Sequence, residues 1–227
     1  MTRAPSALTS LVKAGFANLS ESRGRLEDLG YEASDFSSAA DPDLALKTIH
    51  ALEEKSPQAL RALWAKPTAR QRLVLLTGAS SGLGDFLHRH VDQWTVVSGP
   101  LKRPLDAERY GAVLQTALKG KEGDEAVVAL RVAYRRELCR IALWDSSAAS
   151  PLEVVDVVAR ALSDLAGAAL ENALYLARQT HDVPAEKVPL AIIGMGKAGA
   201  RELNYLSDVD VIYVTEVHEG EDPDRVM

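Results

Sequence analysis

Hydrophobic residues recur at three- and four-residue steps through most of the chain, which predicts a largely helical protein. From Ser6 to about Gly120 this pattern is broken often. Asp41-Pro42 and Ser56-Pro57 each place an N-cap residue before a proline at the first helical position. The first pair opens a helix, and the expected elements that follow are Gln58 to Trp64, Thr68 to Leu76, a turn from Gly78 to Gly84, Asp85 to Val91, and Asp106 to Leu118.

Two longer helices follow. The first is expected from about Glu125 to Leu143, with one buried stripe formed by Val127, Leu130, Tyr134, Leu138 and Ile141. Ser150-Pro151-Leu152-Glu153 is a capping box with proline at the first helical position, and it predicts a helix to about Gln179. The apolar stripe of that second helix comprises Val155, Val158, Leu162, Leu165, Ala169 and Leu176.

The pattern changes near the C-terminal end, where two apolar runs flank a glycine-rich stretch. Pro189 to Ile193 predicts a strand, Gly194 to Gly199 a turn, Ala200 to Asn204 a short helical patch, and Val209 to Val214 a second strand. The predicted fold class is therefore mostly α: a helical N-terminal region, residues 1–148, followed by the start of an α/β domain with a small, incomplete sheet, residues 149–227.

Asp208 and Asp210 stand at the head of the second predicted strand. Residues two apart in a strand point to one side, so both carboxylates are expected to face away from Val209, Val211 and Tyr213. Two carboxylates opposite a glycine-rich turn suit a divalent metal that bridges phosphate oxygens. The alternative is a solvated strand end beside an ordinary turn.

Composition excludes several classes of protein. The 227 residues are 47% hydrophobic and 26% charged, as in ordinary globular proteins. The net charge of −6 gives no sign of a nucleic-acid or membrane-surface partner, and no apolar run is long enough to span a bilayer. A single cysteine, Cys139, fits a reducing cytoplasm and forms no internal disulfide.

Eleven residues separate Gly196 from Asp208, which gives the nucleotidyltransferase pattern G-x11-D-x-D. The wider string GMGKAGARELNYLSDVDVIYV closely resembles the active-site signature of the bacterial glutamine synthetase adenylyltransferase/adenylyl-removing enzymes. Looser similarity covers Gly78 to Trp94, Leu130 to Asp145 and Val158 to Leu174. Trp144 and Ala200 depart from the residues expected in that family, an arginine and a glycine.

The resemblance implies an adenylyl-removing activity, in which inorganic phosphate displaces a glutamine synthetase tyrosine from AMP and yields ADP. It implies Mg²⁺ held by Asp208 and Asp210, and phosphate contacts from Gly194, Gly196, Lys197 and Ser207. Enzymes of this family are longer and take a third metal carboxylate from a later strand, so an inactive N-terminal fragment is expected here. ATP, for the full-length enzyme, and a PII-type nitrogen signalling protein are further expected partners.

Three alternatives stay open at this point. A helical fragment could dock glutamine synthetase or a regulator without catalysis. TGASSGLG, from Thr77 to Gly84, also resembles the cofactor turn of short-chain dehydrogenases, although no Tyr-x-x-x-Lys accompanies it and a helix–helix turn explains its glycines better. Arg131, Arg135, Arg136 and Arg140 either bind phosphate, pack against the catalytic unit, or form acid–base pairs with Glu137.

Two further groups of residues are expected to be structural. His88 and His90, with Asp92, resemble metal ligands, but residues two apart on a helix do not share a face. We therefore expect His88, His90 and Asp92 to lie at a solvated helix end. Cys139 lies inside the first long helix and is expected to be a small buried residue rather than a nucleophile.

Overall fold

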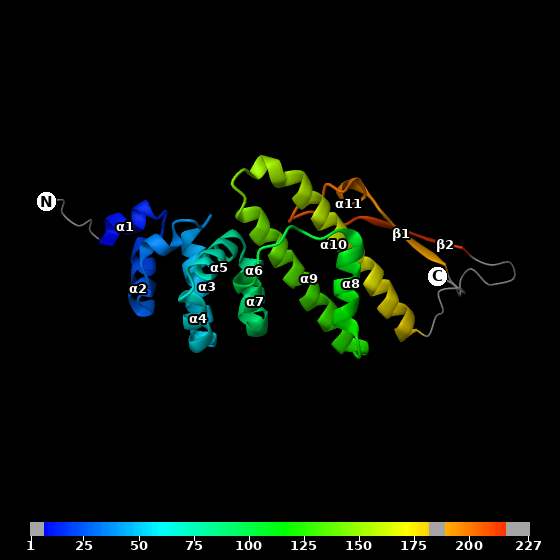
Figure 1. Cartoon of the computed structure of the whole chain (residues 1–227), viewed down its shortest axis with the longest axis horizontal. Coiled ribbons are helices and arrows are strands. Elements are labelled where there is room, and N and C mark those ends of the chain that lie inside the picture. The colour runs from blue at the N-terminus through cyan, green and yellow to red at the C-terminus, as the bar shows by residue number, and fades with distance from the viewer. Residues whose placement is uncertain (1–6, 182–188, 217–227) are drawn as a thin grey trace. The chain divides into compact units, whose positions relative to one another are not determined.

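The computed structural model describes residues 7–181 and 189–216 (Figure 1). Within these residues the protein is mostly helical and carries one two-stranded sheet, which confirms the predicted fold class. The helices are α1 (Ala7–Lys13), α2 (Leu19–Leu29), α3 (Pro42–Lys55), α4 (Pro57–Trp64), α5 (Pro67–Ala79), α6 (Ser81–Arg89), α7 (Thr95–Ser98), α8 (Ala107–Leu118), α9 (Gly123–Ser146), α10 (Pro151–Thr180) and α11 (Gly196–Ala200). Two 3₁₀ turns, Ala33–Phe36 and Val91–Trp94, and the strands β1 (Leu190–Gly194) and β2 (Val211–Thr215) complete the set.

Packing divides the chain into two compact units. The first extends to Lys102 and includes Ala142–Ala149, and the second comprises Arg103–Ile141 and the described residues from Ser150 onward. The long helix α9 therefore contributes residues to both units. The sequence predicts that a catalytic domain starts at residue 149, and this boundary stays a prediction.

The first unit is organised around α3, which packs against α2, α4, α5 and α6. The predicted cap is present, because an Asp41 carboxylate oxygen accepts a hydrogen bond from the Leu44 N–H at 2.9 Å. Leu46, Ile49 and Leu52 are fully buried along one face of the helix, as their spacing predicts. Ser56 also precedes a helix, α4, but its side chain forms no capping hydrogen bond.

The TGASSGLG string joins two helices rather than a strand and a helix. α5 continues to Ala79 and α6 begins at Ser81, so the expected turn over Gly78 to Gly84 is wrong, and Ser80 alone separates the helices. A Cβ on Gly78 would lie 2.7 Å from the Ala39 Cβ, and one on Gly84 would lie 2.8 Å from the Thr48 Cγ2. The glycines allow close packing, and the absence of a preceding strand removes the structural basis for a dehydrogenase cofactor turn.

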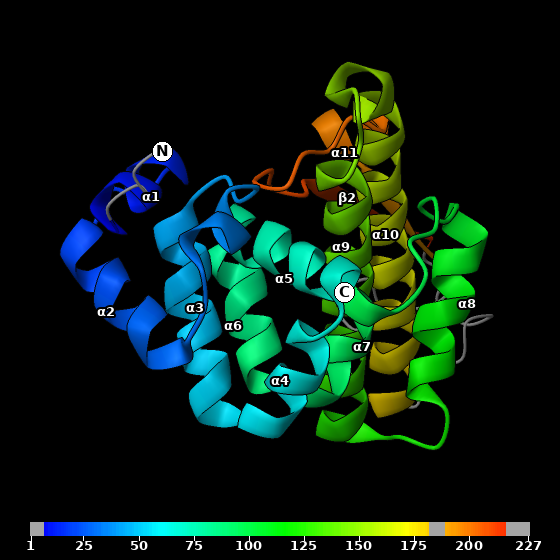
Figure 2. The same ribbon diagram turned by 60° about the vertical axis from the view of Figure 1, so that its left-hand side comes forward.

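In the second unit α8 packs lengthwise against α10 (Figure 2). Both ends of the predicted second long helix are close to those of α10, but the Ser150 side chain makes no capping hydrogen bond, so the capping box is not formed. The exposed Val155, 53% accessible, lies outside the core. On α9 the expected stripe is also displaced, because Val127 is 38% exposed whereas Ala126, Ala133 and Glu137 are buried.

The two strands pair antiparallel, with Gly194 opposite Val211 and Leu190 opposite Thr215. The expected helical patch from Ala200 to Asn204 is wrong, because α11 starts within the glycine-rich stretch and ends at Ala200. Arg201 ends that helix in a left-handed conformation with φ of 60°. The second strand starts two residues later than expected, at Val211.

Candidate functional site

Asp208 and Asp210 lie in the segment that leads into β2, and both side chains are exposed. The Asp210 carbonyl accepts a hydrogen bond of 2.8 Å from the Met195 N–H, so pairing with the chain after β1 continues one step beyond the sheet. Val209, between the two aspartates, lines a crevice of about 580 Å³ with residues of α10 and β1, and neither aspartate lines it. Among the described residues, neither carboxylate has a hydrogen-bond or ion-pair partner, so both are open to a ligand.

The glycine-rich stretch holds α11 directly against the end of β1. A Cβ on Gly199 would lie 2.3 Å from the Gly194 carbonyl oxygen, so this approach requires glycine. Gly196 begins the helix with φ of 52°, a second conformation that favours glycine. The backbone of both candidate phosphate-binding glycines, Gly194 and Gly196, therefore lies in one tight turn beside the chain that leads into β2.

Lys197 and Ser207 are brought together although they are ten positions apart in the sequence. The Lys197 ammonium Nζ donates to the Ser207 Oγ at 3.3 Å, and this hydroxyl donates to the Asn204 Oδ1 at 2.8 Å. The Asn204 Oδ1 also accepts from the Leu206 N–H at 3.0 Å. A cation on α11 and a hydroxyl on the loop before the two aspartates thus lie within hydrogen-bond distance of each other, and both groups have the chemistry to bind a phosphate.

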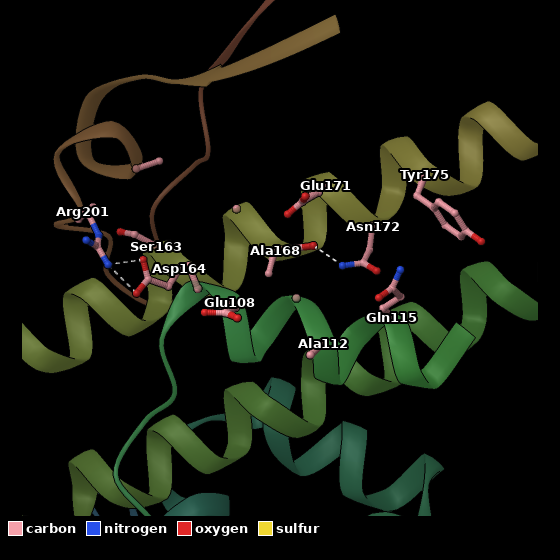
Figure 3. A pocket seen from close by; sticks show the side chains of 14 residues that line it. Glu108, Ala112, Gln115, Ser163, Asp164, Ala168, Glu171, Asn172, Tyr175 and Arg201 are labelled. Carbon is pink, nitrogen blue, oxygen red and sulfur yellow. Dashed lines mark hydrogen bonds and ion pairs between the residues drawn. The ribbon is translucent and has the colours of Figure 1, made fainter. Parts of the chain in front are cut away.

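A bidentate ion pair attaches this region to α10 and was not foreseen from the sequence. The Arg201 Nη2 donates to both carboxylate oxygens of Asp164, at 2.6 and 2.7 Å (Figure 3). Next to it, the Leu203 N–H donates to the Ser163 Oγ at 3.2 Å. The available signal was the pair Ser163-Asp164 between Leu162 and Leu165, because polar residues within an apolar helical stretch need buried partners.

The remaining candidates have structural roles. Burial raises the pKa of the Cys139 thiol to about 12. The side chain is buried, which agrees with the prediction of a small buried residue rather than a nucleophile. Arg136 and Arg140 pair with the buried Glu137, with Nε–Oε1 and Nη1–Oε1 distances of 3.2 and 2.6 Å. These contacts support the interpretation that Arg136 and Arg140 form acid–base pairs with Glu137.

Two candidate metal ligands, Asp208 and Asp210, lie in this region. Residues 7–181 and 189–216 contain no group of three or more His, Cys, Asp or Glu side chains that could hold an ion, and His88 and His90 belong to no such group. Asp208 and Asp210 are two free carboxylates, and Mg²⁺ commonly binds one or two carboxylates together with water and substrate phosphates. The donor chemistry of these two residues therefore fits Mg²⁺.

The sequence matches the Glutamate-ammonia ligase adenylyltransferase family over residues 70–226. The chain belongs to this family. Its relatives include the bifunctional glutamine synthetase adenylyltransferase/adenylyl-removing enzyme of Leifsonia xyli subsp. xyli, 41% identical over all of this chain and 25% of the relative. The proteins of the same name from Streptomyces coelicolor and Bifidobacterium longum are 40% and 33% identical, over 97% and 91% of this chain and 21% and 22% of their own lengths.

The chain thus spans about a quarter of the length of these family members. The matched region of the family includes α6 to β2 and every candidate site residue. No helix among the described residues is both long and apolar enough to cross a membrane.

Proposed function

We propose that this chain contributes part of a metal-dependent nucleotidyltransferase site that removes AMP from a tyrosine of glutamine synthetase. The observation that carries the proposal is two free, exposed aspartates in the segment before β2, which pairs with the glycine turn through the Asp210 carbonyl, within a member of the adenylyltransferase family. The names of the relatives include both adenylyltransferase and adenylyl-removing activity on glutamine synthetase. We assign this part to the removing activity because of its resemblance to the N-terminal half of those enzymes.

In the proposed reaction an oxygen of inorganic phosphate attacks the phosphorus of the AMP group in line. The bond from this phosphorus to the tyrosine oxygen breaks, ADP forms, and the tyrosine regains a proton from solvent. Bound Mg²⁺ would neutralise charge that develops on the phosphate oxygens. Asp208 and Asp210 would hold the metal, the turn at Gly194 and Gly196 would admit a phosphate close to the backbone, and Lys197 would supply a positive charge.

The test replaces each aspartate by asparagine in the whole natural polypeptide to which these residues belong. Asp208→Asn and Asp210→Asn keep the side-chain size but remove the negative charge, so phosphate-dependent release of ADP from adenylylated glutamine synthetase should fall by at least about 100-fold. Thermal unfolding should stay near that of the wild type, because neither side chain has a partner among the described residues. Wild-type activity in either variant would refute the site assignment.

A second candidate function is docking or regulation without catalysis. It is favoured by the ligand set of the candidate site, because among the described residues no third His, Cys, Asp or Glu joins Asp208 and Asp210. The aspartate variants of the whole polypeptide separate the two functions, because docking alone predicts wild-type turnover in both variants. We expect no turnover by this chain alone, and detectable turnover would contradict that expectation and exclude the docking-only function.

A further inference from the structure

Arg201 adopts an unusual conformation for its residue type. Within the described residues it is the one non-glycine residue with a positive φ, 60°. Left-handed backbone costs free energy in any residue with a Cβ, and glycine is the residue that normally ends a helix in this way. An arginine at this position implies that its side chain forms an interaction that offsets the cost.

The interaction is the bidentate pair with Asp164, whose side chain is 8% exposed (Figure 3). A buried carboxylate requires a partner, and a guanidinium that binds both oxygens fixes direction as well as distance. Leu203, which is 5% exposed, adds the hydrogen bond from its N–H to the Ser163 Oγ. Two neighbouring residues of α10 thus hold the chain immediately after α11.

The same short segment, Arg201 to Leu203, directly precedes the loop that carries Ser207 and Asp208. Within it, the Glu202 N–H donates to the Lys197 carbonyl at 2.8 Å, which ties the segment to α11. After it, the chain continues through Asn204 to Ser207, whose hydroxyl accepts a hydrogen bond from Lys197 of α11, and then to Asp210, whose carbonyl accepts one from the Met195 N–H. The attachment at Arg201 and Leu203 is therefore the anchor on the N-terminal side of the loop that carries Ser207 and Asp208.

We infer that Arg201 and Asp164 are positioning residues, which hold the loop from Asn204 to Asp210 in the geometry that the candidate site needs. This inference rests on the function proposed above. Neither residue touches phosphate or metal in this role, and both act through the backbone. Residues that orient metal ligands in this indirect way typically change activity by about 10- to 100-fold when they are replaced.

The experiment uses the whole natural polypeptide with three single substitutions. Arg201→Gly keeps a residue suited to φ of 60° and removes the whole side chain with its guanidinium, and Asp164→Asn keeps the size of its partner while removing the charge. Arg109→Gln is the matched control, because Arg109 lies on α8, lines the same crevice as Asp164 and Arg201, and pairs with Asp106 at 3.6 Å rather than with Asp164. The readouts are kcat and KM for phosphate, thermal unfolding, and amide hydrogen exchange from Asn204 to Asp210.

Arg201→Gly and Asp164→Asn should each lower kcat by about 10- to 100-fold, change KM for phosphate by less than about two-fold, and speed exchange in this loop selectively. Arg109→Gln should match the wild type. Unchanged kcat and exchange in Arg201→Gly would mean that the residue only ends a helix, and faster exchange throughout α10 would mean general unfolding; either result overturns the inference. If the wild type releases no ADP, the proposed function fails, and the exchange measurement alone decides the positioning role.

Discussion

Replacing Gly199 by alanine tests whether the close approach of α11 to β1 is a real constraint on the candidate site. The new Cβ would lie 2.3 Å from the Gly194 carbonyl oxygen and 3.0 Å from its carbonyl carbon. Both are backbone atoms, so no flexible side chain can move aside. Opening the shorter distance even to 3.0 Å requires α11 to shift away from the strand, and overpacking of this kind typically costs about 1–3 kcal/mol.

Gly167→Ala is a matched control with the opposite expected sign. Gly167 lies inside α10, and an added Cβ there meets no atom within 4 Å. Alanine in a helix interior is favoured over glycine by about 0.8–1.0 kcal/mol. The same chemical change should therefore stabilise the protein at Gly167 and destabilise it at Gly199.

Thermal unfolding and hydrogen exchange measure the two effects. For a chain of this size about 1 kcal/mol corresponds to roughly 2–4 °C in the midpoint temperature. Gly199→Ala should also speed exchange of the Met195 N–H, because its bond to the Asp210 carbonyl depends on the turn remaining closed. If Gly199→Ala is as stable as Gly167→Ala and leaves the Met195 N–H protected, the approach of α11 to β1 does not require glycine at position 199.

Two further predictions concern acidic groups, one buried and one partly buried, whose pKa values are raised. Burial raises the pKa of the Cys139 thiol to about 12 from 9.0, so at pH 8 the native protein should react with a thiol reagent about 1,000-fold more slowly than the unfolded chain; equal rates would refute this. Burial, followed by the charge of Glu53, raises the pKa of Tyr31 from 10.0 to about 12, so its stabilising effect should be complete below pH 10 and be lost as pH rises toward 12. Between pH 10 and pH 12, the free energy of unfolding measured by chemical denaturation should fall more steeply for the wild type than for Tyr31→Phe. Parallel pH dependences of the two proteins would contradict the raised pKa of Tyr31.

Local signals in the sequence located most helices correctly. Asp41-Pro42 starts α3 as predicted, because an N-cap and the proline after it act within one turn and need no distant partner. Periodicity also found α8, α9 and α10, with ends accurate to a few residues. It misjudged the buried stripe of α9, because Glu137 is buried only when Arg136 and Arg140 pair with it.

In the candidate site, too, the sequence indicated local patterns but not the contacts between distant residues. The sequence identified the glycine turn and the two aspartates, because G-x11-D-x-D is a contiguous pattern. It placed the short helix after the turn rather than inside it, since nothing local indicates that Gly199 packs on Gly194. The exposure of Asp208 and Asp210 and the contact of Lys197 with Ser207 are visible only in the folded chain.

By itself the sequence determined the helical class, the start of a small sheet, and the residues with the chemistry to bind a metal and phosphate. Tertiary structure alone decided how these residues are held, because Asp164 and Arg201 are 37 positions apart and meet only when the chain after α11 lies on α10. Side-chain spacing specifies local geometry, whereas a part-buried ion pair between distant segments depends on the packing that brings them together.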